Sequence, residues 1–131
     1  MVMAQAKHYD HEKIEALKVQ YLTEELELTP EEAKNFWPLY EEYHKKERTI
    51  QQDRLRHFID KEKLSNLKDS EIDDLITEEF TRQQKLLNLR TTYYEQFKKA
   101  LGTRKAALYF NAEINFRKRL IRQLRERRKD Q

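Results

Sequence analysis

The spacing of apolar residues predicts that this chain is built from long helices. From about Asp10 to Leu26, apolar side chains recur every three or four residues, which gathers them on one face of a helix. A second run with this spacing begins at Pro30 and continues past Pro38, whose ring is expected to bend the helix. The two apolar faces contain Ile14, Leu17, Tyr21 and Leu22, and then Ala33, Phe36, Trp37, Tyr40 and Tyr43.

The second half of the chain repeats the helical spacing after a short break. Residues 61–69 are the expected break, and a third helix is expected to reach Leu101. Gly102, the only glycine, stands where a left-handed residue ends a helix, and Thr103 is expected to cap a fourth one. The sequence therefore predicts four helices, of which the second and third are the longest.

Two of the expected helix starts have related sequences. At the first, Leu28 precedes Thr29, a good N-cap, and Glu32 falls at the third helical position, which is the arrangement of a capping box. At the second, 39 residues later, Asp69 or the serine after it is expected to cap the helix, with Glu71 in the first turn.

Composition supports an all-α fold. The chain has 131 residues with one glycine, two prolines and no cysteine, so few residues favour the tight turns that join strands. Its two longest helices would each measure on the order of 45 Å. A body this thin cannot cover its apolar stripes alone, so we expect a two-fold symmetric homodimer. No apolar run has the length of a membrane span, so we expect no membrane insertion.

The sequence predicts one helical domain over residues 10–126 with a short segment at each end. Residues 1–9 are expected to be disordered, and the small residues Ala4 and Ala6 resemble the end of a secretory signal peptide. An ordinary start to the chain explains this pattern equally well. Residues 127–131 are expected to form a frayed basic tail.

Positive charge is concentrated at the C-terminal end. The whole chain has a formal net charge of +3, whereas residues 117–131 contain eight basic and two acidic residues. This segment can be a solvated face, a nucleic-acid surface, or a surface for unfolded or acidic polypeptide clients. Because no aromatic residue follows Phe116 for base stacking, nucleic acid is not an expected partner. The predicted client-binding residues are Arg117, Arg119, Arg122, Arg125, Phe116 and Leu120.

Few residues are suited to catalysis or to holding a cofactor. The two serines, Ser65 and Ser70, have no histidine partner implied by spacing, and one glycine cannot form a glycine-rich phosphate loop. We therefore expect neither an enzyme nor a cofactor. His8, Asp10 and His11 are weak candidates for a metal site, although exposed histidines on a helix are the commoner interpretation.

Two groups of residues have both a structural and a functional interpretation. If Glu113 is exposed, it pairs with Arg117 one turn later. If Glu113 is partly buried, it bridges to an arginine of another helix and acts as a lock that holds the two helices together. We favour the lock. Trp37, Tyr40 and Tyr43 are expected in the core, but the same aromatics could dock a second helix and make the protein a structural adaptor.

The helix starts resemble the motifs of a known family. The segment LTPEE at 28–32 resembles the first LTxxQ motif of the Spy/CpxP family of periplasmic helical proteins, with glutamate in place of glutamine. LKDSE at 67–71 resembles the second motif, with lysine in place of threonine and glutamate in place of glutamine. Segments 36–43 and 105–120 are similar to a Bacteroidetes-type branch, often described as periplasmic heavy-metal sensors or sensors of ECF-type sigma factors.

This resemblance, which covers roughly residues 12–125, implies a fold, a location and a function. The fold would be an elongated, hooked helical hairpin of four helices that forms a dimeric cradle in the periplasm. Thr29 and Glu32 would stabilise the first turn, and Asp69 and Glu71 the second. The implied function is ATP-independent holding of unfolded clients, or another role in envelope stress. The alternative is a periplasmic metal or stress sensor that regulates a membrane or sigma-factor partner.

Overall fold

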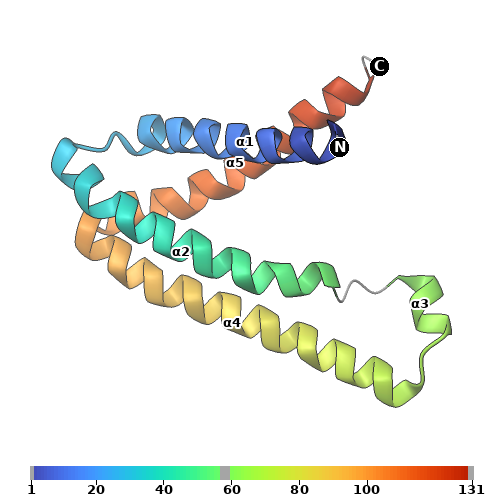
Figure 1. Cartoon of the computed structure of the whole chain (residues 1–131). Helices are drawn as coiled ribbons and strands as arrows, with labels where there is room; N and C mark the ends of the chain where they lie inside the picture. Colours follow the sequence, from blue (N-terminus) through green and yellow to red (C-terminus); the bar gives the residue numbers. More distant parts are fainter. Residues whose placement is uncertain (1, 57–59, 130–131) are drawn as a thin grey trace. The chain divides into compact units, whose positions relative to one another are not determined.

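The computed structural model describes the backbone of residues 2–56 and 60–129 and the side chains of residues 12–52 and 60–128. Every element within these residues is a helix (Figure 1). The helices are α1 (Val2–Leu26), α2 (Pro30–Arg56), α3 (Lys61–Ser65), α4 (Asp69–Leu101) and α5 (Thr103–Lys129). The predicted all-α class is therefore confirmed, whereas the hooked shape and the dimer stay predictions.

The helices extend further than the sequence indicated. α1 begins at Val2, so it includes residues for which we expected disorder; residues 2–9 contain neither glycine nor proline to stop the helix. The five-residue helix α3 lies in the expected break, and its cap is Asp60, whose Oδ1 accepts a 2.7 Å hydrogen bond from the Lys63 amide. α5 continues to Lys129, into the segment expected to fray. The domain limits at residues 10 and 126 stay a prediction.

The two related helix starts are built differently. At α2, the Glu32 amide donates to Thr29 Oγ1 at 3.1 Å and the Thr29 amide donates to Glu32 Oε1 at 3.0 Å, so the predicted capping box is confirmed. At α4, the Lys68 amide donates to Glu71 Oε1 at 3.0 Å. Lys68 therefore occupies the N-cap position, and the expected cap at Asp69 or Ser70 is wrong, because both residues lie inside the helix. Because lysine has no acceptor oxygen, half of the second box is missing.

Completing the second capping box is expected to stabilise the protein. Lys68→Thr supplies a hydroxyl that can accept from the Glu71 amide and removes a cation from a helix N-terminus, so the free energy of unfolding should rise by about 1 kcal/mol. Thr29→Lys is the matched change at the first capping box and should lower the free energy of unfolding by a similar amount. Urea unfolding followed by circular dichroism measures both, and an unchanged Lys68→Thr midpoint would contradict the N-cap assignment.

The chain divides into two compact units, which we describe separately. Unit 1 contains Met1–Ala33 and Leu101–Gln131, and in it α1 packs antiparallel against α5 (Figure 1). Unit 2 contains Lys34–Ala100, and in it α2 runs antiparallel to α4. Its ring contacts include Phe36 with Phe97, at 5.3 Å between centroids, and Tyr43 with Tyr93, at 5.2 Å.

Each unit has its own small core. The core of unit 1 is aliphatic around one tyrosine, whereas that of unit 2 is mainly aromatic. Among the described side chains, the buried hydrophobic ones are Leu22, Leu26, Leu101, Ala106, Tyr109 and Ala112 in unit 1, and Phe36, Tyr40, Tyr43, Leu86, Tyr93 and Phe97 in unit 2. Trp37 is half-buried, with its ring at 5.0 Å from that of Phe36. Pro38 lies exposed inside α2, and the helix continues on both sides of it.

Gly102 forms the junction between the last two long helices. Its φ of +85° lies in the left-handed region, where a side chain would be strained, which confirms the expected helix-ending role. Its carbonyl accepts a hydrogen bond from the Ala106 amide at 3.1 Å. Gly102 is therefore also the N-cap of α5, whereas Thr103, the expected cap, is the first helical residue.

Candidate functional site

Unit 1 contains a groove between α1 and α5. Its volume is about 210 Å³. Both apolar and polar side chains line it. The groove is lined by Leu17, Gln20, Tyr21 and Glu24 of α1, and by Phe116, Arg119, Leu120 and Gln123 of α5.

Two aromatic rings and a guanidinium group meet in this groove. The rings of Tyr21 and Phe116 lie 5.6 Å apart between centroids and are tilted by 39°. The Arg119 guanidinium carbon is 5.9 Å from the centre of the Tyr21 ring, within the range of a cation–π contact. The Leu17 side chain is 43% exposed beside them. The groove therefore presents apolar surface and positive charge together.

The predicted client-binding residues divide between two faces of α5. Phe116, Arg119 and Leu120 line the groove, whereas Arg117, Arg122 and Arg125 are exposed and are not among its lining residues. Helical geometry explains the division: residues three and four apart share a face, and a neighbouring position points about 100° away. The contributions of Leu17 and Tyr21 were not predicted, because their i, i+4 spacing indicates only that they share the apolar face of a helix.

An ion pair joins the two helices near the groove. Lys18 Nζ lies 2.7 Å from Glu113 Oε2, and the two side chains are only 10% and 17% exposed. The Tyr109 hydroxyl donates to Glu113 Oε1 at 2.6 Å. Glu113 thus bridges to another helix, although its partner is a lysine and not the arginine that we expected.

A second set of contacts joins the α1–α2 turn to α5. Lys105 Nζ donates to Glu32 Oε1 at 2.7 Å and to the Glu27 carbonyl at 2.9 Å. The hydrogen bond from Lys105, followed by that from the Thr29 amide, lowers the pKa of Glu32 from its usual value of 4.5. The glutamate of the first motif therefore contributes both the capping box and an ion pair. Lys105 carried no motif that would have marked it as a partner.

Acidification is expected to remove the contribution of Glu32 to stability. A carboxyl group whose pKa is lower in the folded state adds stability above its unfolded pKa and loses it as the pH falls through the folded value. Glu32→Gln should therefore be less stable than the wild type at pH 7, and the two should converge below about pH 4. Thermal unfolding between pH 7 and pH 3 measures this, and a difference that does not change with pH would contradict it.

The other predicted motif residues lie at helix starts or on exposed surface. Leu28 is half-buried, Thr29, Asp69 and Glu71 are exposed, and Glu32 is half-buried. These positions fit a structural role in the turns, as the sequence resemblance implies.

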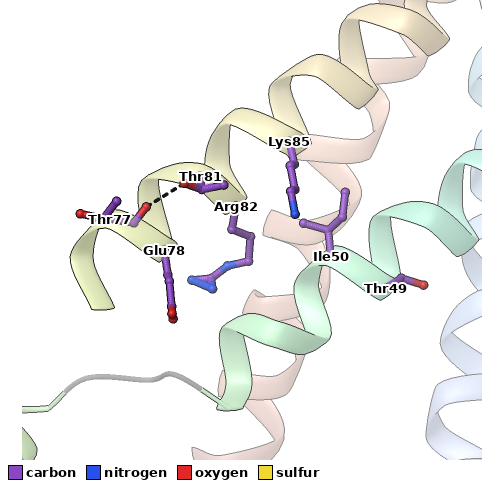
Figure 2. A pocket seen from close by; sticks show the side chains of 7 residues that line it. All are labelled: Thr49, Ile50, Thr77, Glu78, Thr81, Arg82 and Lys85. Atoms are coloured by element: carbon purple, nitrogen blue, oxygen red, sulfur yellow. Dashed lines mark hydrogen bonds between the residues drawn. The ribbon is translucent and has the colours of Figure 1, made fainter. Parts of the chain in front are cut away.

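Unit 2 contains a larger groove, of about 460 Å³, between α2 and α4 (Figure 2). Two of its polar side chains make contacts within α4: the Arg82 guanidinium pairs with Glu79, and the Thr81 hydroxyl donates to the Thr77 carbonyl at 2.9 Å. The lining also includes Thr49, Ile50, Glu78 and Lys85. We regard the smaller groove as the better candidate, because it exposes aromatic and aliphatic surface beside a cation.

The described side chains contain no group of three His, Cys, Asp or Glu residues that could hold a metal ion. The weak candidates His8, Asp10 and His11 lie outside the described side chains, so a metal site there stays a prediction. Among the described residues, none of the helices is both long and apolar enough to cross a membrane.

Comparison of the chain with protein-family models, with curated proteins and with solved structures finds no match. The resemblance to the LTxxQ motifs therefore stays a prediction from residues 28–32 and 67–71.

Proposed function

We propose that this protein holds unfolded or acidic polypeptide segments in the groove between α1 and α5, without ATP and without catalysis. One observation supports this most strongly: the Tyr21–Phe116 ring pair lies beside the Arg119 guanidinium in an open groove. Apolar client side chains would pack on the rings, and client carboxylates would approach the guanidinium.

The surrounding charge suits a weak and unspecific interaction. Residues 117–128 contain seven cations and one carboxylate, a net charge of +6. Such a field attracts acidic segments from a distance, and it is screened by salt. Long arginine stems also cover apolar surface while the charged group stays in water. Clients would be recognised by composition and not by sequence.

A periplasmic location and a role in envelope stress belong to the same proposal. Their support is the resemblance of the two helix-start motifs, and the first of these is a complete capping box. The alternative, a metal or stress sensor with a membrane or sigma-factor partner, depends on side chains outside the described residues and stays a prediction.

We also propose that the protein acts as a homodimer through an exposed face of α4. Ile76, Phe80 and Leu87 are 39%, 63% and 56% exposed. They lie within about 40° of one another around the helix. The face is separate from the one that buries Tyr93 and Phe97 in unit 2.

The charges on this face of α4 suit an antiparallel pair. Asp69 and Asp73 lie at its N-terminal end, and Lys98 lies at its C-terminal end. A two-fold axis between residues 83 and 84 would place Phe80 against Leu87 of the second copy. The same axis would bring the acidic end of each helix beside the basic end of the other, as an isologous contact requires.

The holding function is tested by aggregation of a chemically unfolded model protein, without ATP, at low and high salt. We expect stoichiometric wild-type protein to suppress aggregation, less so at high salt. Changing Arg117, Arg119, Arg122 and Arg125 to glutamate should abolish suppression while helicity is retained. The matched control changes four exposed cations of unit 2 to glutamate: Lys34, Lys45, Arg48 and Lys99.

The control variant has the same change in net charge as the α5 variant. Comparing the two therefore separates the effect of the α5 surface from the effect of total charge. If the control variant suppresses aggregation and the α5 variant does not, the result supports the proposal. Equal activity of the two variants would refute the assignment to α5. A wild-type protein that does not suppress aggregation at either salt concentration would refute the holding function itself.

A further inference from the structure

The face of α5 that points away from the groove carries exposed aliphatic side chains. Ile114, Ile121 and Leu124 are 52%, 45% and 48% exposed. They fall within about 80° of one another around the helix. Their face is centred roughly 150° from that of Phe116 and Arg119, which line the groove. The proposed client site therefore does not use these side chains.

Cations lie along the same face and beside it. Arg117 and Arg128 occupy it, and Arg125 borders it; all three side chains are exposed. Among the described residues, no salt bridge includes any of the seven cations between residues 117 and 128. The face thus combines positive charge that no carboxylate of the described residues pairs with and a row of aliphatic groups about 15 Å long.

We propose that this face of α5 binds the surface of an anionic lipid bilayer. The helix would lie in the plane of the interface, with Ile114, Ile121 and Leu124 at the boundary of the acyl chains. Arg117, Arg125 and Arg128 would extend their stems to the headgroups and neutralise lipid phosphates. Such a helix lies on a membrane without crossing it.

An anionic bilayer matches this face better than other occupants do. A bilayer has dense negative charge at its headgroups and an apolar layer directly beneath them. The guanidinium ends would meet the headgroups, and the aliphatic side chains would meet the apolar layer. A second copy would bring a net charge of +6 against another +6, which is repulsive. Nucleic acid would satisfy the arginines but would leave the three aliphatic side chains without apolar contact.

Vesicle flotation with the full chain tests this proposal. We expect the protein to float with vesicles of phosphatidylglycerol and phosphatidylethanolamine, and not with vesicles of phosphatidylcholine alone. The double variant Ile121→Ser/Leu124→Ser should partition ~10-fold less, because its apolar contact is lost. Arg117→Gln/Arg125→Gln should partition roughly 25-fold less. Circular dichroism checks that each variant keeps its helicity.

Leu108→Ser provides the matched control. Leu108 is 36% exposed on the opposite face of α5 and precedes the basic segment, so its change should leave flotation unaltered. A wild-type chain that does not float, or equal flotation of the Ile121→Ser/Leu124→Ser variant, would overturn the proposal. Displacement from vesicles by inorganic phosphate at the same phosphorus concentration would do so as well. The aggregation assay is separate, so failure here leaves the holding function standing.

Discussion

Glu113→Ala is expected to destabilise unit 1 by about 3 kcal/mol. In the wild type, the Glu113 carboxylate accepts from the Tyr109 hydroxyl and pairs with Lys18 at 2.7 Å. Removing it would leave the ammonium of Lys18, whose side chain is 10% exposed, without this partner. We place the effect at the lower end of the range for a broken buried pair, because Glu113 itself is 17% exposed and water reaches it.

A variant with both partners replaced separates the effect of the ion pair from that of the space it fills. Lys18→Met alone should also destabilise, whereas Lys18→Met/Glu113→Leu should recover most of the loss, because apolar packing can replace a buried ion pair. Glu126→Ala changes an exposed glutamate of the same helix and should alter the free energy of unfolding by less than about 0.5 kcal/mol. Urea unfolding measures all four variants. A Glu113→Ala variant as stable as the wild type would contradict the lock.

The local pattern of the sequence was enough to predict most helices and one complete cap. Residues three and four apart define a helix face without knowledge of its partner, and Thr29 with Glu32 can be recognised as a capping box from residue types alone. The cap of α4 was placed too late. Residue preference favours Asp69, but the Glu71 side chain satisfies the amide of Lys68 instead.

The sequence predicted residues of the candidate site on α5 but not those on α1. The basic composition after Phe116 drew attention to α5, and three of the six predicted residues line the groove. Tyr21 completes the site, but its position opposite Phe116 depends on how α1 packs against α5. The pattern of one helix does not encode the register of its neighbour. For the same reason, Glu113 was expected to bridge between helices, but its partner Lys18 could not be identified.

Phe80→Asp is expected to prevent the proposed dimer. The Phe80 side chain is 63% exposed, so its change should have little effect on the folding of unit 2. In an antiparallel pair, however, it would place a carboxylate against Leu87 of the second copy, twice per dimer. Burying two carboxylates without partners should raise the dimer dissociation constant by at least ~100-fold. Sedimentation equilibrium at micromolar concentration measures this change.

A charge exchange tests the direction of pairing. Asp69→Lys and Lys98→Asp should each weaken the dimer, because the antiparallel register places residue 69 opposite residue 98 of the second copy and each change brings like charges together there. The double variant exchanges these two facing charges and should restore dimerisation, whereas a parallel pair would not be restored in this way. Thr92→Glu, on another face of α4, adds a similar negative charge and should leave the dimer intact. A wild-type chain that sediments as a monomer would contradict the proposed dimer, and single variants without effect would contradict its register.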